Sequence, residues 1–367
     1  MNHTIQSPEP CAAPALFERV RQAPLTRREQ IVADLAELQR QAGLGWALRA
    51  LFRQQVACGY VLFDPADPAM LAEKRFVVPG DTAIALRLQW NPQRELRLDH
   101  ALLIERGVFA KVAPERLVNR TDTGGCYLCP RNIALQSPAE ILLPLTLNDE
   151  PYLLGANFAP ITDNHFTVIP SAHRPQRYRR GLLRAGFELA EASGGTFRVL
   201  FNGRAGASIL AHAHLHATDA RLPVEDLTAA PLLFRQGDDL RVSRPDYPLP
   251  LWLVEGRDAD AVIRAGDRLI RAWRRRDPAR HSENLLMSVD AGRYRLFIVP
   301  RDRERLTAPE RTAAMASFET AGLIVLSHPS ERRLFETADA ALVRQLLTAL
   351  TPACPPEAVL GPAMLGF

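Results

Sequence analysis

The chain has 367 residues, of which 47% are hydrophobic and 23% are charged. This balance is typical of a soluble globular protein and excludes a mainly disordered chain, a collagen and a small disulfide scaffold. The formal net charge of +4 is too small to indicate a nucleic-acid partner. No stretch approaches the ~18 consecutive apolar residues of a membrane span. The length allows two domains, or one unit built from two similar halves.

Cysteine usage points to a reducing compartment. The chain contains five cysteines, and an odd number of this size does not form a disulfide framework. The N-terminus also lacks the basic patch and continuous apolar run of a secretory signal. We therefore expect a cytoplasmic protein that binds neither a membrane nor a nucleic acid.

The predicted elements begin with a helical N-terminal region. Apolar residues near helical spacing predict a helix over 26–51, and Thr26-Arg-Arg-Glu29 has the pattern of a capping box that would start it. Alternation of apolar and polar residues predicts a strand over 82–90, which ends at the turn signal Asn91-Pro92. We expect residues 114–151 to be mostly loop.

The following elements occur twice in a similar plan. We predict strands over 152–158, 166–170, 197–201 and 209–218, with a helix over 181–193. The C-terminal third repeats the plan with a helix over 259–273 and strands over 251–254, 284–289, 294–300 and 322–327. Segments 166–170 and 296–300 are both apolar strands that end at proline and then turn basic. This likeness indicates an α+β fold with a duplicated half.

The strongest signal for chemistry is the segment Ala211-His-Ala-His-Leu-His-Ala217. On a strand, His212, His214 and His216 would point to one face with ~7 Å between successive Cα atoms. Such a row can bind a metal, or it can attack phosphorus and stabilise phosphoryl oxygens. The alternative is a row of exposed histidines on a surface strand.

A loop of small residues precedes the histidines. The segment Asn202-Gly-Arg-Ala-Gly-Ala-Ser208 offers free backbone N–H groups, and its small residues allow a phosphate to approach the backbone. Asn202, Arg204, Gly206 and Ser208 are therefore candidates for phosphate binding. An ordinary hairpin loop would explain this segment alone, but the adjoining histidines make the phosphate interpretation more specific.

Cys126 and Cys129 have the C-x-x-C spacing of half a metal site. The spacing alone leaves three interpretations open, which are a metal clip, two reduced thiols without a metal, and a redox pair. The redox pair is disfavoured because no suitable helix starts after Cys126.

These segments together resemble the histidine-triad nucleotidyltransferases of the branch that contains galactose-1-phosphate uridylyltransferase, ATP adenylyltransferase and the GDP-hexose phosphorylases. The resemblance spans about residues 85–340, and within this branch it is greatest to a group of bacterial proteins related to the GDP-hexose phosphorylases. It rests on segments 91–94, 126–132, 157–176, 202–217 and 318–322. It implies two histidine-triad-like halves around an antiparallel sheet. We expect an N-terminal extension over 1–80, a catalytic half over 81–230 and a degenerate half over 231–367.

The resemblance implies a two-step transfer through a covalent nucleotidyl-histidine. His214 would attack the α-phosphorus of a nucleotide-sugar or dinucleoside polyphosphate, while Ser208, Asn202 and the loop amides would hold the phosphoryl oxygens. Phosphate or a sugar phosphate would then accept the nucleotidyl group. A backbone carbonyl that accepts the second ring N–H of His214 would fix its tautomer.

One position departs from the branch. Its transferases and phosphorylases usually have glutamine where this chain has His216. Histidine is typical of the hydrolases of the superfamily, so a hydrolase of the same substrates is the alternative function. A zinc-stabilised nucleotide-binding module is the alternative without catalysis.

The resemblance also implies ligands and further contacts. In the uridylyltransferase type, positions equivalent to His173 and His212 complete a structural Zn²⁺ site with the cysteine pair. Asn91, Arg94, His165 and Gln176 are candidates for substrate binding, although a turn, a core histidine or a surface side chain would also explain them. Mg²⁺ would assist a polyphosphate, yet no carboxylate cluster demands it. Many relatives form homodimers, and the sequence leaves the oligomeric state open.

Overall fold

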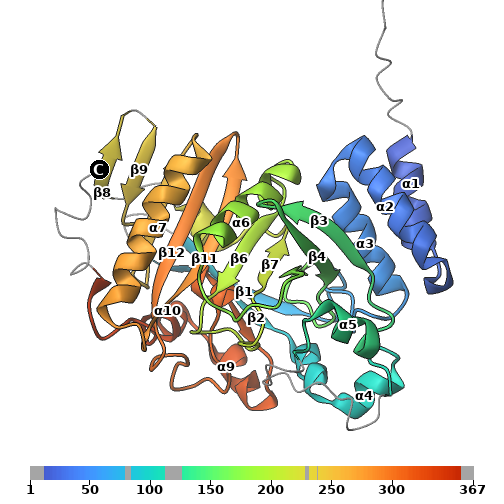
Figure 1. Cartoon of the computed structure of the whole chain (residues 1–367). Helices are drawn as coiled ribbons and strands as arrows, with labels where there is room; N and C mark the ends of the chain where they lie inside the picture. The colour runs from blue at the N-terminus through green and yellow to red at the C-terminus, as the bar shows by residue number, and fades with distance from the viewer. Residues whose placement is uncertain (1–11, 79–83, 112–125, 228–230, 238, 357–367) are drawn as a thin grey trace, which may run out of the picture.

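A computed structural model describes residues 12–78, 84–111, 126–227, 231–237 and 239–356 (Figure 1). Its helices are α1 Ala12–Gln22, α2 Arg28–Ala42, α3 Leu44–Ala57, α4 His100–Glu105, α5 Pro130–Gln136, α6 Arg180–Ala192, α7 Ala259–Arg276, α8 Ser317–Thr320, α9 Arg332–Thr337 and α10 Ala340–Thr348. Its strands are β1 Ala72–Val78, β2 Ile84–Trp90, β3 Leu142–Leu147, β4 Glu150–Ala156, β5 Phe166–Pro170, β6 Arg198–Asn202, β7 Leu215–Thr218, β8 Leu232–Gln236, β9 Leu240–Ser243, β10 Trp252–Gly256, β11 His281–Asp290, β12 Arg293–Asp302 and β13 Leu323–Leu326.

A ten-stranded sheet with antiparallel pairing forms the centre of the molecule. Its order is β3-β4-β5-β7-β6-β11-β12-β10-β9-β8. Read outward from the central β6–β11 pair, the second half repeats the order of the first: β6, β7, β5, β4 and β3 correspond to β11, β12, β10, β9 and β8. Helices α6 and α7 occupy equivalent places in the two halves. The structure therefore confirms an α+β fold and supports its duplication.

The strand order corrects one detail of the predicted repeat. Residues 166–170 form β5, whose counterpart is β10, whereas residues 296–300 belong to β12, the counterpart of the histidine strand β7. The two similar segments are thus not equivalent. The two segments are alike because both strands are buried and therefore consist of continuous apolar residues.

The two faces of the sheet are covered differently. Helices α6 and α7 lie side by side across one face (Figure 1). Gly186 of α6 and Gly266 of α7 allow this close packing, because a Cβ at either position would collide with Met287 or Leu296 of the sheet. The opposite face packs against the small β1-β2-β13 sheet through a second apolar core that includes Leu86, Leu200 and Leu323.

The N-terminal helices pack against the β3–β4 end of the sheet (Figure 1). The predicted helix over 26–51 is two helices, because Gly43 adopts φ +89° and breaks the chain between α2 and α3. The predicted capping box is wrong. A 3-10 turn over Leu25–Arg27 precedes α2, and no side chain caps the first turn of the helix. Packing against the sheet therefore determines where these helices begin and end more than local capping residues do.

Two further predictions need correction. Within the expected loop over 114–151, residues 114–125 lie outside the described part, but α5, β3 and the start of β4 lie in the rest. The expected strand over 209–218 shortens to β7. For the strand over 82–90, residues 82 and 83 lie outside the described part. No helix among the described residues is long and apolar enough to cross a membrane.

Candidate active site and metal cluster

A cavity of about 330 Å³ opens over the first half of the large sheet. This volume lies at the lower end of the range for small-molecule sites. Polar and charged side chains from distant segments meet along its wall, namely Arg94, Arg97, Glu140, Asn157, His165, Thr167, Asn202, Ser208, His214, His216, Arg311, Glu319 and Ser327. The backbone of Gly206 also lines it. The sequence analysis named seven of these fourteen residues as site candidates.

The three histidines of the 212–216 segment have different environments. His214 and His216 line the cavity, with ring centroids 5.3 Å apart. His212 is fully buried, and its ring packs against that of His173 instead. Only His216 lies within β7, so the histidines do not form the predicted row on one regular strand.

The reason for this irregularity is the hydrogen bonding of residues 210–214. The N–H of Ala213 donates to the Arg174 carbonyl, and the N–H of Gln176 donates to the Leu210 carbonyl. The Gln176 side chain accepts from the His214 N–H at 2.7 Å and donates to the carbonyls of Asn202 and His214. Gln176 is buried and joins the strand end of β6 to the histidine segment. It is not among the residues that line the cavity.

His214 has the geometry of a neutral nucleophile. Its Nδ1 lies 3.0 Å from the His212 carbonyl oxygen, which can only accept a hydrogen bond. The ring proton therefore resides on Nδ1, and Nε2 keeps a free lone pair. Burial lowers the pKa of His214 to about 4, so the ring is neutral at physiological pH. The predicted backbone acceptor for this histidine is present.

His216 is held by another histidine. The Nε2 of His165 lies 3.1 Å from the Nδ1 of His216, and the N–H of Ile161 donates to the Nδ1 of His165. Burial lowers the pKa of His216 to about 3 and that of His165 well below its ordinary value. Both rings line the cavity as neutral groups.

The 202–208 loop lies at the junction of the two halves. The Asn202 side-chain oxygen accepts from Nδ2 of Asn284 at 2.8 Å and from the N–H of Ser317 at 2.7 Å. Asn202, Gly206 and Ser208 line the cavity. Arg204 does not line the cavity. Burial lowers the pKa of Arg204, and the positive charges of the nearby Arg303, Arg177 and Arg274 lower it further.

Two arginines, the half-buried Arg94 and the buried Arg311, bring positive charge to the cavity. Arg94 donates to the Ala159 carbonyl, and burial lowers its pKa to about 9. Arg311 has a nearly buried side chain paired with Glu331 at 3.0 Å, but its Nη1 finds no hydrogen-bond partner among the described residues. Asn91 is fully buried, and its amide donates to Gln89 and the Pro160 carbonyl rather than lining the cavity.

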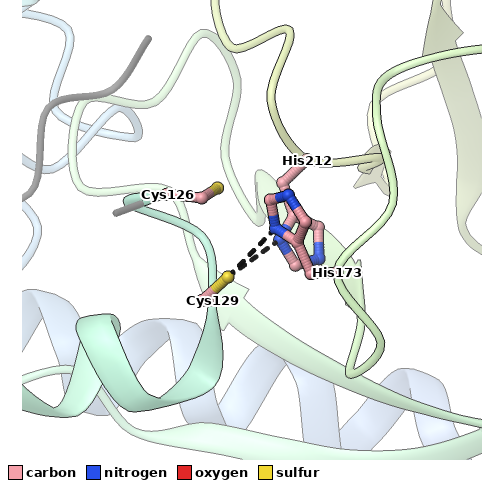
Figure 2. A group of neighbouring side chains, drawn as sticks. All are labelled: Cys126, Cys129, His173 and His212. Atoms are coloured by element: carbon pink, nitrogen blue, oxygen red, sulfur yellow. Dashed lines mark hydrogen bonds between the residues drawn. The ribbon is translucent and has the colours of Figure 1, made fainter. Parts of the chain in front are cut away.

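A separate cluster brings together Cys126, Cys129, His173 and His212, whose potential ligand atoms all lie within 4.8 Å of one another. Figure 2 shows the two imidazoles beside the Cys129 thiol. The Sγ of Cys129 lies 3.2 Å from the Nδ1 of His173 and 3.6 Å from the Nδ1 of His212. The structure thus forms the cluster that the resemblance implied.

The donor set fits a zinc ion. With Zn–S of about 2.3 Å and Zn–N of about 2.0–2.1 Å, a tetrahedral site separates its ligand atoms by roughly 3.3–3.8 Å. His212 is also oriented as a ligand, because its Nε2 lies 2.9 Å from the Pro170 carbonyl and donates to it. This leaves the Nδ1 lone pair toward the cysteines, as in zinc sites whose histidines are held by a second hydrogen bond.

Sequence reasoning missed several residues of the cavity wall. Arg311, Tyr60, Glu140 and Asn157 line it, and the first of these is contributed by the second half of the chain. The sequence shows no motif at Arg311, Tyr60 or Glu140. A signal was present for Asn157, which begins the 157–176 segment on which the family resemblance rests.

Comparisons with known proteins agree with this architecture. The family described as "Domain of unknown function (DUF4922)" matches residues 75–219. Structures of yeast Ap4A phosphorylase Apa2 match with 16% identity and a TM-score of 0.56 for the AMP complex, over 83% of this chain and 96% of that one. The Ap4A complex gives 16% identity and a TM-score of 0.54, over 83% and 97%. No curated protein matches the chain.

The chain has the fold of the Ap4A phosphorylases. At this identity the likeness concerns the fold alone, and the match to nearly the whole length of the phosphorylase includes both halves of the sheet. The expected histidine-triad-like fold is therefore confirmed.

Proposed function

We propose that this chain is a nucleotidyltransferase that acts on a dinucleoside polyphosphate or a nucleotide-sugar through a covalent intermediate on His214. The observation that carries the proposal is the 3.0 Å contact between the His214 Nδ1 and the His212 carbonyl. It leaves a neutral Nε2 on a residue that lines the cavity. The likeness to Ap4A phosphorylase, whose structures contain AMP and Ap4A, supports a nucleotide substrate.

The reaction consists of two displacements at phosphorus. The Nε2 lone pair of His214 attacks the α-phosphorus, a P–N bond forms, and the P–O bond to the leaving group breaks with its electron pair on the departing oxygen. An oxygen of inorganic phosphate or a sugar phosphate then attacks the same phosphorus. The P–N bond breaks, its electron pair returns to Nε2, and the neutral histidine is regenerated.

The groups around His214 suit the negative charge of the phosphoryl oxygens. Ser208 and the loop around Gly206 offer a hydroxyl and backbone amides in the cavity wall. Arg94 and Arg311 add guanidinium groups to the same wall, and the buried Nη1 of Arg311 has no acceptor among the described residues. A phosphate of the leaving group or of the acceptor would satisfy it.

We assign the catalytic work to the half over residues 81–230. The half over 231–367 would complete the cavity wall with Arg311. Of the region over 1–80, the described helix α3 packs against β4 and would support the catalytic half. Zn²⁺ bound at Cys126, Cys129, His173 and His212 would link the α5 segment to the histidine segment and so orient His214. No step of the reaction needs the ion.

The state of His216 supports the transferase over the hydrolase alternative. A pKa of about 3 keeps its ring neutral, so it does not serve as a proton donor of the imidazolium type at neutral pH. Its partner His165 makes it a hydrogen-bond donor toward the cavity, which is the role a glutamine amide would have. This favours transfer over hydrolysis.

The test is an incubation of the purified full-length protein with diadenosine tetraphosphate, GDP-glucose, GDP-mannose, UDP-glucose and UDP-galactose, each with and without inorganic phosphate. We expect phosphate-dependent release of a nucleoside di- or triphosphate, lost in His214→Ala and kept in the matched control His100→Ala on the exposed start of α4. Substrate labelled at the α-phosphorus should leave label on the wild-type protein and on His100→Ala, but not on His214→Ala.

Release of a nucleoside monophosphate regardless of added phosphate would identify the hydrolase instead. Full turnover by His214→Ala would refute the proposed intermediate. Nucleotide binding without turnover by the wild-type protein would favour the binding module.

A further inference from the structure

Part of the cavity wall is aromatic. Tyr60, Tyr127 and Phe158 line it. The ring centroids of Tyr60 and Phe158 are 6.3 Å apart, and Phe109 contacts both Phe158 and Tyr127 at 5.5 and 5.7 Å. Aromatic walls of this kind bind flat apolar rings such as nucleobases.

A buried carboxyl group lines the same cavity. Glu140 is only 7% exposed and lines the cavity. Gly155 of β4 makes room for it, because a Cβ at that position would collide with Oε1 of Glu140. The carboxyl group thus occupies the space above β4 that a side chain would otherwise fill.

The strand register relates this carboxyl group to the catalytic histidine segment. Gly155 pairs with Thr167 of β5, and Thr167 pairs with His216 of β7. Residues directly opposite each other in antiparallel strands point to the same face. Glu140 therefore lies on the same face of the sheet as His216, two strands away, or roughly 10 Å. That separation suits a nucleotide whose phosphate is at the histidines and whose base is at Glu140.

The N-terminal helices hold Glu140 in place. Arg28 of α2 donates to the carbonyls of Glu140 and Pro138, and Gln55 of α3 bonds to the backbone of Ala139 and Ile141. The Tyr60 hydroxyl donates to the Glu140 carboxyl group. The backbone and one carboxyl position are thereby fixed, and the carboxyl group keeps further acceptor positions toward the cavity.

From this arrangement we infer that Glu140 selects guanine, by accepting hydrogen bonds from the N1–H and the 2-amino group of the base. The inference rests on the proposed function in that the cavity is taken as a nucleotide site. Guanine presents two adjacent N–H donors, which match the two oxygens of a carboxylate. A buried carboxylate needs such donors because each unpaired lone pair is costly.

The other bases offer a poorer match. Adenine presents one amino group beside the acceptor N1, and this ring nitrogen would repel an ionised carboxylate. Uracil presents one N–H between two carbonyl oxygens, which would face the same carboxylate. A carboxylate in this wall therefore matches the donor edge of guanine better than the corresponding edge of adenine or uracil.

The test measures binding of GMP, AMP and UMP to the full-length protein by titration calorimetry. We expect GMP to bind more tightly than AMP and UMP. In Glu140→Gln the GMP affinity should fall by between about 5- and 150-fold, the range for loss of a bidentate base contact, while AMP changes little. Glu105→Gln, at the exposed end of α4, is the matched control and should keep the preference.

A second variant tests the same contact in case Glu140→Gln does not fold. Gly155→Ala keeps Glu140 but displaces its carboxyl group, so it should also lose the GMP preference, and thermal unfolding shows whether each variant is folded. A wild-type preference for AMP or UMP, or an unchanged GMP-to-AMP ratio in both folded variants, would overturn the inference. Because binding needs no turnover, inactivity toward every substrate would refute the proposed function and leave this result to be judged separately.

Discussion

The Nε2 of His165 lies 3.1 Å from the Nδ1 of His216, and this contact sets the tautomer of a histidine in the cavity wall. The N–H of Ile161 donates to Nδ1 of His165 at 3.2 Å, so the proton of His165 resides on Nε2. His165 then donates to the Nδ1 of His216, whose own proton resides on Nε2. His216 is thereby held as a neutral N–H donor, and it is polarised by a chain of hydrogen bonds that starts at the backbone.

A glutamine amide would also donate at this position. We therefore expect His216→Gln to keep phosphate-dependent turnover within about tenfold of the wild type. His216→Ala should lower kcat by about 10²- to 10³-fold, as loss of one preorganised donor to a charged transition state does. Steady-state kinetics with and without phosphate measure both effects.

His165→Ala should reduce kcat as well, and His216→Gln should relieve part of this loss because an amide needs no tautomeric partner. Equal and large losses in His216→Gln and His216→Ala would contradict the donor role. Monophosphate as the main product of the wild type, but not of His216→Gln, would favour the hydrolase alternative instead.

The sequence predicted what depends on local patterns. It gave the histidine segment, the C-x-x-C pair and the strand periodicities, and the structure places Cys126, Cys129, His173 and His212 together as the family resemblance implied. Long-range contacts were not accessible in this way. Arg311 reaches the cavity only because β6 pairs with β11, and Glu140 reaches it only because Gly155 leaves room.

The same difference explains the errors in secondary structure. The 209–214 segment has the alternation of a strand, but its backbone bonds go to Arg174 and Gln176, which lie outside the sheet. The capping box at Thr26 has the right residue types. However, the first residue of α2 is determined by the packing of the helices on each other and on the sheet. In both places tertiary contacts override a local preference.

The metal cluster gives a second prediction. Cys129→Ser removes the thiol that lies 3.2 Å and 3.6 Å from the two imidazoles, so the purified variant should contain less than one tenth of the wild-type zinc by elemental analysis. The melting temperature should fall, because binding energy of a structural metal contributes to folding. Cys58→Ser, a partly buried cysteine of the α3 end, is the control.

Chelation of the wild-type protein should lower its melting temperature to that of Cys129→Ser without changing the variant. Wild-type protein that carries no zinc after expression in zinc-supplemented medium, with an unchanged melting temperature for Cys129→Ser, would exclude a structural metal.

The junction of the two halves gives a third prediction. Asn284 donates to the Asn202 side chain at 2.8 Å, and its own oxygen accepts from the fully buried Arg301. Asn284→Ala leaves that guanidinium with one acceptor fewer, and burial already lowers the pKa of Arg301 to about 10. We expect the free energy of unfolding to fall by about 1.5–3 kcal/mol, the usual contribution of a hydrogen bond to a charged group.

Urea denaturation measures this loss, with Gln345→Ala on the exposed side of α10 as a surface control. Because Asn202 also lines the cavity, Asn284→Ala should weaken nucleotide binding in protein that is still folded. Loss of stability with unchanged binding would show that Ser317 alone suffices to hold Asn202.

The last prediction concerns pH and the selection of guanine. Burial raises the pKa of Glu140 to about 7, opposed by the hydrogen bond from Tyr60 and by the charge of Arg28. Within the described part of the chain, Arg28 is the charged group that acts on this carboxyl group. Burial raises the pKa of Tyr60 well above its ordinary value, so that hydroxyl does not titrate near neutrality. Only the ionised form of Glu140 can accept from both N–H donors of guanine.

The ionised fraction of a carboxyl group with a pKa near 7 grows about tenfold between pH 6 and pH 8. The ratio of GMP to AMP affinity should therefore rise by roughly that factor over this range, and it should stay flat in Glu140→Gln. Titration of the phosphate affects both nucleotides alike and cancels in the ratio. A ratio that stays flat or falls with rising pH would contradict this role of the carboxylate. The separate affinities identify the opposite base: an AMP affinity that itself falls as pH rises would mean that the protonated carboxyl group donates to N1 of adenine.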